Sequence, residues 1–291
     1  MCDEHTAIEE EAALAARGLS RREFAAIGAA GVLAACTASE GQAAKARATS
    51  ESMVKVTTPD GTADAFFVHP ARGKAPAVIM WPDIAGLRDA YKAMARRLAD
   101  DGFAVLAVNP YYRTAPAPLL DSISQWRTPE GQARLKPALE AISVDGIKRD
   151  AAALVAWLDR QQAVDKRRGI GTQGYCMTGA WAIRTAATVP ERVRAAASFH
   201  GGGLVTDKPD SPHRLLEQTR ARFLIAIARN DDAKAPTDKD ALREAAKKAG
   251  RSAEIEVYAA DHGWCTLDAP VYDKAEADRA WTRLLALYKR L

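Results

Sequence analysis

The sequence is short of cysteine, of long hydrophobic runs and of clustered positive charge. Its four cysteines, at positions 2, 36, 176 and 265, include no Cys-x-x-Cys pair, which argues against a disulfide framework or a structural zinc site. The apolar stretch 25–35 is too short to span a bilayer comfortably. Lysine and arginine total 41 residues but form no basic block, so we predict no nucleic-acid partner.

The sequence does contain enough apolar material for a globular body. Its 291 residues are 48% hydrophobic, and the formal net charge is only +4. This balance argues against an intrinsically disordered chain, because a sizeable core can be buried. The length suits one large α/β domain or two small ones.

Residues 1–36 have the features of an export signal. Arg21 and Arg22 precede the short apolar stretch, which resembles a twin-arginine signal, the route of proteins exported already folded. The sequence Leu-Ala-Ala-Cys that ends at Cys36 matches a lipobox, in which this cysteine is lipidated and attaches the protein to a membrane. The alternative is cleavage after the small residues near 44–46, which would leave a soluble periplasmic protein. We therefore expect a protein of a bacterial envelope.

The rest of the chain divides into a tether and a domain. Residues 37–52 are rich in Ala, Ser, Thr and charge without any period, which is typical of a flexible tether. In residues 53–291, β-rich runs alternate with segments of helical periodicity, after a hairpin predicted around the turn 59–61. This alternation predicts an α/β fold with a mostly parallel sheet and helices on both faces. The expected parallel strands are 77–81, 104–108, 168–175, 194–199, 222–228 and 254–258.

Residues 111–143 interrupt this alternation. The segment contains four prolines and has no strand-like run. Connections of this length are usually functional lids or inserts, although an incidental insertion with one short helix is an equally simple interpretation.

The strongest chemical signal is the sequence Gly-Tyr-Cys-Met-Thr-Gly at 174–179. It stands between a predicted strand and a predicted helix, so Cys176 occupies a sharp turn at the sheet edge, beside the positive end of the helix dipole. That position suits a thiolate nucleophile. A buried cysteine that merely packs is the alternative, but it does not explain the strand, turn and helix arrangement.

Two further groups follow in the order that a nucleophile, acid and histidine triad requires in this kind of fold. Asp231 follows the strand 222–228, and His262 follows the last strand, so both reach the rim where open α/β sheets bind ligands. Asp232 is the alternative acid, because one sequence does not decide between neighbours. His200 also ends a strand but precedes the acid, which favours a structural or substrate-contacting role.

These residues carry a resemblance to the dienelactone hydrolase (carboxymethylenebutenolidase) family of the α/β-hydrolase superfamily. The elbow 174–179, the downstream aspartate, His-Gly-Trp at 262–264, and the segments 81–86 and 109–113 occur in the family's order. The resemblance covers residues 53–291 and implies hydrolysis of a small ester or lactone without metal or organic cofactor. It also implies that the backbone N–H groups of Ile84 and Met177 stabilise the oxyanion.

Three positions bear on what the resemblance implies. The family usually has glycine where this chain has Thr178, which narrows the room behind the elbow. Asp83 stands where the family has a first-loop glutamate that helps to ionise the thiol. Because aspartate is one methylene shorter, Asp83 either activates the thiol more weakly or is an ordinary loop acid. Arg113 resembles the family's anchor for a substrate carboxylate, although a surface arginine is an equally good interpretation.

Three functions are consistent with the sequence. The leading one is ester or lactone hydrolysis through a thioester on Cys176. The second is an envelope-anchored binding protein whose triad is vestigial. The third is a redox-active thiol with Cys265 as the candidate partner, for which the sequence offers no resolving-cysteine motif. The sequence makes no prediction of the oligomeric state.

Overall fold

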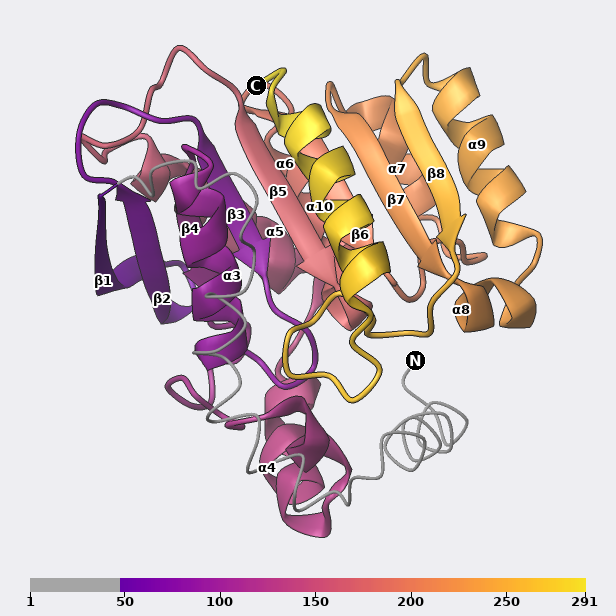
Figure 1. Cartoon of the computed structure of the whole chain (residues 1–291), viewed down its shortest axis with the longest axis horizontal. Helices are drawn as coiled ribbons and strands as arrows, with labels where there is room; N and C mark the ends of the chain where they lie inside the picture. Colours follow the sequence, from indigo (N-terminus) through magenta and orange to yellow (C-terminus); the bar gives the residue numbers. More distant parts are fainter. Residues whose placement is uncertain (1–47) are drawn as a thin grey trace.

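Continuous apolar runs form the centre of an eight-stranded sheet in the computed structural model, which describes residues 48–291 (Figure 1). Such runs are typical of parallel strands that are buried on both faces. The strands are β1 (Thr49–Thr58), β2 (Gly61–Pro70), β3 (Ala77–Trp81), β4 (Ala104–Val108), β5 (Ile170–Tyr175), β6 (Val193–Phe199), β7 (Arg222–Ala228) and β8 (Ala253–Tyr258).

The strand order is β1-β2-β4-β3-β5-β6-β7-β8. Strands β1 and β2 form the predicted antiparallel hairpin, and β2 also pairs antiparallel with β4. All the other pairs are parallel. The predicted α/β fold with a mostly parallel sheet is therefore confirmed, and the carboxyl ends of β3 and of β5 to β8 meet along one rim.

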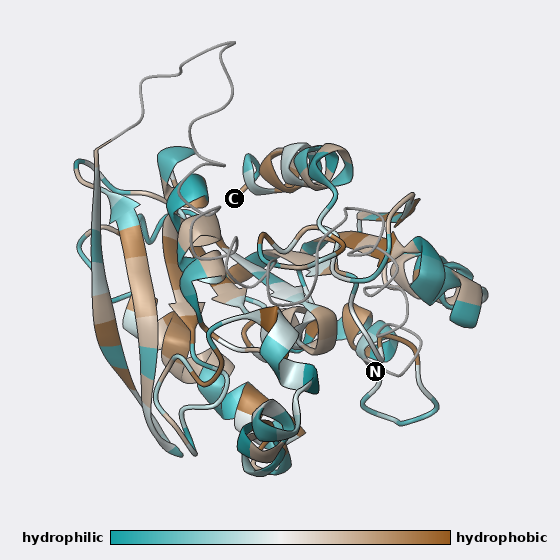
Figure 2. Ribbon diagram, turned by 60° about the horizontal axis from the view of Figure 1, so that its bottom comes forward, coloured by the Kyte–Doolittle hydropathy of each residue, from teal (hydrophilic) through white to brown (hydrophobic). Residues whose placement is uncertain are grey.

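Helices cover both faces of this sheet (Figure 1). Helices α3 (Asp89–Asp100) and α10 (Lys274–Tyr288) pack on one face. The other face is covered by α5 (Val144–Leu158), α6 (Gly179–Thr188), α7 (Pro212–Leu215) and α9 (Asp238–Lys248). Figure 2 shows hydrophobic residues along the central strands and hydrophilic residues on the outer helices, as burial of one apolar stripe per helix requires.

The first strand begins earlier than the sequence predicts. Thr49 to Ser52, which we assigned to the tether 37–52, pair with β2 in a hairpin that extends over ten register pairs. Glu51 also forms an ion pair with Arg96 of α3. The domain therefore includes these four residues, because an uninterrupted hairpin offers them backbone partners.

Export and lipidation remain predictions, because Cys36 and the arginine pair lie outside the described residues. Within residues 48–291 no helix combines the length and hydrophobicity needed to cross a bilayer.

The insertion 111–143 contains two helical segments and lies beyond the carboxyl rim of the sheet (Figure 1). These are the 3-10 helix η1 (Ile123–Arg127) and helix α4 (Pro129–Glu140). The insertion packs in a small hydrophobic cluster of its own, which also includes Ala85, Ala269 and Val271 from the loops after β3 and β8. It is therefore attached to the two loops that border the candidate site.

Candidate active site

Cys176 occupies a sharp turn between β5 and α6, as the sequence predicts. Its φ angle is 55°, in the left-handed region that non-glycine residues rarely adopt. The turn depends on two glycines: a Cβ on Gly174 would lie 2.0 Å from the Thr178 carbonyl oxygen, and one on Gly179 would lie 2.6 Å from the Cα of Gly201. Any side chain at either position would open the turn.

Thr178 supports this turn from behind. Its hydroxyl accepts a hydrogen bond from the Tyr175 N–H at 2.9 Å and donates to the Trp81 carbonyl at 2.8 Å. The threonine side chain, where the family usually has glycine, therefore fastens the elbow to the neighbouring strand β3. Sequence analysis noted the departure but not this role, because the contact joins residues 97 positions apart.

The structure brings Asp231 and His262 together. The Asp231 carboxylate accepts from His262 Nδ1 at 2.7 Å, and the Asn230 side chain accepts the His262 backbone N–H at 2.9 Å. Asp232 instead receives Lys239 Nζ at 2.7 and 2.8 Å. Of the two neighbouring aspartates, Asp231 therefore faces the histidine, because the short helix α8 (Arg229–Lys234) turns Asp232 away.

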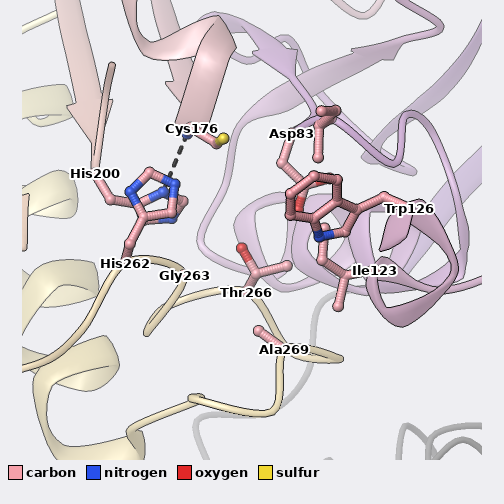
Figure 3. A pocket seen from close by; sticks show the side chains of 10 residues that line it. Asp83, Ile123, Trp126, Cys176, His200, His262, Gly263, Thr266 and Ala269 are labelled. Atoms are coloured by element: carbon pink, nitrogen blue, oxygen red, sulfur yellow. Dashed lines mark hydrogen bonds between the residues drawn. The ribbon is translucent and has the colours of Figure 1, made fainter. Parts of the chain in front are cut away.

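A pocket lies between these elements (Figure 3). The nucleophile candidate and both rim histidines share it with residues from two loops, after β3 and after β8, and from the insertion. The lining residues are Asp83, Ile84, Ile123, Trp126, Cys176, His200, His262, Gly263, Thr266 and Ala269. Ile123 and Trp126 belong to η1, so the insertion 111–143 forms part of the pocket wall.

His200 lies against the elbow (Figure 3). Its Nδ1 accepts the backbone N–H of Cys176 at 3.1 Å. Burial, together with the neighbouring His262, lowers the pKa of His200 well below its usual value. The ring is therefore neutral, with its proton on Nε2, and within residues 48–291 this nitrogen has no hydrogen-bond partner.

A buried arginine, Arg88, joins three segments of the pocket wall. All five of its N–H groups are used, towards Asp83, Asp268 and the Gly86 carbonyl, at 2.7 to 3.1 Å. Burial alone would lower the Arg88 pKa, but the charges of Asp268 and Asp83 raise it well above its usual value. Asp268 also accepts the Ile123 N–H at 3.1 Å, which attaches the insertion.

Sequence reasoning missed Arg88 and Asp268. They lie 180 positions apart, and no motif distinguishes this arginine from the other basic residues. The consequence for Asp83 is direct: both of its carboxylate oxygens receive N–H groups of Arg88, and one of them also accepts the Ala85 N–H. Asp83 thus lines the pocket with a carboxylate that is fixed by hydrogen bonds from Arg88 and from the Ala85 N–H.

Arg113 is not among the residues that line the pocket, so this site gives no support to its predicted role as a substrate anchor. Its guanidinium donates to Asp60 in the β1–β2 turn and to Asp150 in α5, at distances of 2.6 to 3.2 Å. It also lies over the Tyr112 ring. These contacts fix the hairpin to α5, so this arginine has a structural function that the segment 109–113 does not reveal.

The two predicted oxyanion donors come from different segments, the loop after β3 and the turn after β5, and Met177 is not among the residues that line the pocket. Ile84 lines it directly, and within the described part of the chain its backbone N–H has no acceptor. Met177 follows Cys176 at the start of the helical turn. The Tyr111 hydroxyl donates to the Ile84 carbonyl at 2.6 Å and lies 4.0 Å from the Met177 sulfur, so one side chain spans both loops.

Cys265 is buried and does not line the pocket. Burial raises the pKa of its thiol well above the usual value, which disfavours a reactive thiolate. No disulfide joins Cys265 to Cys176. This geometry gives no support to the redox interpretation. Residues 48–291 also contain no cluster of three or more His, Cys, Asp or Glu that could hold a metal.

Comparison with known sequences gives a consistent result. A model of the dienelactone hydrolase family matches residues 63–291. A "Putative carboxymethylenebutenolidase" of Synechocystis sp. is 26% identical over 223 residues, which are 75% of this chain and 87% of that protein. A "Probable 2-oxo-3-(5-oxofuran-2-ylidene)propanoate lactonase" of Bradyrhizobium sp. is 27% identical over 223 residues, 73% and 83% of the two chains.

Solved structures share the fold. A "Putative Dienelactone Hydrolase" from Klebsiella pneumoniae superposes with a TM-score of 0.72 at 21% identity, covering 84% of this chain and all of that one. The dienelactone hydrolase from Anabaena variabilis gives a TM-score of 0.57 at 19% identity, covering 83% of this chain and 97% of that one. At these identities the likeness establishes the fold alone.

Proposed function

Because the chain belongs to the dienelactone hydrolase family, we propose that it hydrolyses a small ester or lactone with Cys176 as the nucleophile. One observation carries this proposal: Cys176, on a strained turn, shares a pocket with a histidine whose Nδ1 is bound to Asp231. The family's hydrolytic activity and the names of the relatives agree with such a substrate.

In the proposed reaction, His262 removes the thiol proton through Nε2, and the Cys176 thiolate attacks the carbonyl carbon. The ester C–O bond then breaks, the leaving oxygen takes the proton from His262, and a thioester remains on Cys176. Water, deprotonated by the same histidine, then attacks the thioester carbon, the C–S bond breaks, and the acid is released. The Cys176 sulfur takes the proton back from His262. With a lactone, acid and alcohol leave as one molecule.

Asp231 keeps His262 in the tautomer that this sequence of steps requires. A carboxylate 2.7 Å from Nδ1 holds the proton there, so Nε2 is left as the basic nitrogen. The same carboxylate stabilises the imidazolium formed when the thiol proton is transferred.

We assign oxyanion stabilisation to the N–H groups of Ile84 and Met177. Donors of this kind contribute about 3–4 kcal/mol each in acyl transfer. Asp83 we assign to shaping the Ile84 loop rather than to taking the thiol proton, because Arg88 and the Ala85 N–H already hold its carboxylate.

Turnover of a panel of aryl esters and lactones tests the proposal. The Cys176→Ala variant should lose hydrolysis but keep the far-ultraviolet circular dichroism of the wild type. Cys265→Ala is the matched control and should retain activity, because that thiol does not line the pocket. Near-normal turnover by Cys176→Ala would refute the assignment of the nucleophile.

The place of action is a separate proposal. We propose that the protein is exported to the bacterial envelope, on the basis of Arg21, Arg22 and the lipobox at Cys36.

A further inference from the structure

The connection that follows β6 holds the main chain of Cys176 on both sides. His200 Nδ1 accepts the Cys176 N–H at 3.1 Å, and the Gly202 N–H donates to the Cys176 carbonyl at 3.1 Å. No other part of the proposed mechanism uses His200. Within residues 48–291, the one hydrogen bond of the His200 side chain is therefore directed at the backbone of the nucleophile.

The second of these hydrogen bonds fixes more than the carbonyl. The carbonyl of Cys176 and the N–H of Met177 belong to one planar, trans peptide group, so they point in opposite directions. When the carbonyl is held by Gly202, the Met177 N–H is directed to the other side. The first hydrogen bond fixes the peptide group before Cys176 in the same way.

His200 is built to be a rigid acceptor. The His200 ring packs edge to face against His262 and Trp264, with centroid distances of 4.7 and 5.2 Å. The backbone N–H of His200 donates to the Ala226 carbonyl at 2.8 Å. His200 is 1% exposed. Since Nδ1 accepts a hydrogen bond from the Cys176 backbone N–H, this nitrogen must carry no proton of its own.

Such a restraint has a clear purpose at this turn. A non-glycine residue with φ near 55° costs free energy and persists only where surrounding contacts enforce it. Without these contacts the Cys176 side chain and the Met177 N–H would rotate relative to the pocket. A misplacement of 1 Å can cost about 100-fold in rate.

We propose that His200 is a positioning residue: by accepting the Cys176 N–H, its Nδ1 holds the peptide group before Cys176 so that the thiol faces the bound ester. The proposal rests on the assignment of Cys176 as the nucleophile. It gives His200 a function that acts through the nucleophile rather than through a direct contact with substrate.

Three substitutions separate this role from the two alternatives. His200→Asn keeps an acceptor near the position of Nδ1 and tolerates the positive φ of 40°. His200→Gly tolerates that φ without offering an acceptor, and His200→Phe keeps a ring without an acceptor. For each variant, stopped flow measures the rate at which 4-nitrophenyl acetate acylates Cys176. KM and the melting temperature are measured for the same variants.

The positioning role predicts an acylation rate close to wild type for His200→Asn, and a loss of about 10- to 100-fold for both His200→Gly and His200→Phe. KM should change little. If backbone strain alone mattered, the glycine variant would match the asparagine variant. If ring packing alone mattered, only the phenylalanine variant would stay active. Either of these rankings overturns the proposal.

His213→Asn is the matched control. This histidine lies in the same connection, bonds to Ser211 at 2.8 Å and does not line the pocket, so its substitution should leave acylation unchanged. A second test uses only the wild-type protein and so does not depend on whether the variants fold. In its NMR spectrum, the ¹⁵N chemical shifts of the His200 ring should show an unprotonated Nδ1. A protonated Nδ1 would overturn the proposal, whereas acylation of wild-type Cys176 would still support the proposed function.

Discussion

The two adjacent aspartates after β7 differ only in the direction of their side chains. Asp231 lies 2.7 Å from His262, whereas Asp232 pairs with Lys239. Sequence places both at the correct rim but does not decide between them, because the choice depends on how α8 turns.

Asp231→Asn should therefore reduce kcat by about 10³- to 10⁴-fold with little change in KM, since the amide favours the wrong histidine tautomer. Steady-state kinetics with an aryl ester measures this. Asp232→Asn is the control and should be mild, because Lys239 is its partner. The reverse pattern would assign the acid to Asp232, and two mild variants would refute the triad.

The buried, neutral His200 should make stability depend on pH. Its pKa in the folded protein is lowered well below the ordinary 6.5, so the unfolded chain binds a proton there before the folded one does. The stabilising contribution is complete above pH 6.5 and is lost as the pH falls below it, by up to about 1.4 kcal/mol per pH unit.

Urea unfolding between pH 7 and 5 tests this dependence. The free energy of unfolding of His200→Asn should fall less steeply with decreasing pH than that of the wild type. Equal slopes would mean that His200 is protonated in the folded protein.

At the residue scale, strand ends predicted Cys176, Asp231 and His262 as one group, and the structure brings all three to the carboxyl rim. The contacts of Arg113 could not be predicted, and the reason is physical. Its partners, Asp60 and Asp150, come from a turn and a helix whose meeting no local pattern reveals.

At the scale of elements, apolar runs predicted the central strands well because strands that are buried on both faces have little polar sequence to obscure them. The insertion 111–143 was harder to interpret. Its contribution to the pocket depends on the packing of Ile123 and Trp126. It also depends on the hydrogen bond from the Ile123 N–H to Asp268, a carboxylate that Arg88 holds in place.

Removing that arginine should destabilise several elements together. Arg88→Met leaves the carboxylates of Asp83 and Asp268 buried without a cation, and breaking a buried pair in this way costs about 3–5 kcal/mol. Chemical denaturation measures the loss. Arg220→Gln, which removes an exposed ion pair with Glu191, is the control and should cost at most about 1 kcal/mol. Equal effects would show that the buried arginine is not a structural centre.

At the scale of the whole molecule, the predicted export signal should determine where the hydrolase acts. Replacing Arg21 and Arg22 together by Lys should block delivery to the envelope, as measured by fractionation and immunoblotting. Globomycin should cause precursor to accumulate if Cys36 is lipidated. Unchanged delivery of the variant would indicate the general secretory route, and unaltered processing would exclude the lipobox.

Intact-mass spectrometry after brief exposure to an aryl ester is the decisive test of Cys176 as the nucleophile. The wild-type protein should gain the mass of one acyl group, peptide mapping should place this group on Cys176, and Cys176→Ala should gain none. Hydrolysis by the wild type with an acyl group on another residue, or an undiminished adduct in Cys176→Ala, would contradict this assignment.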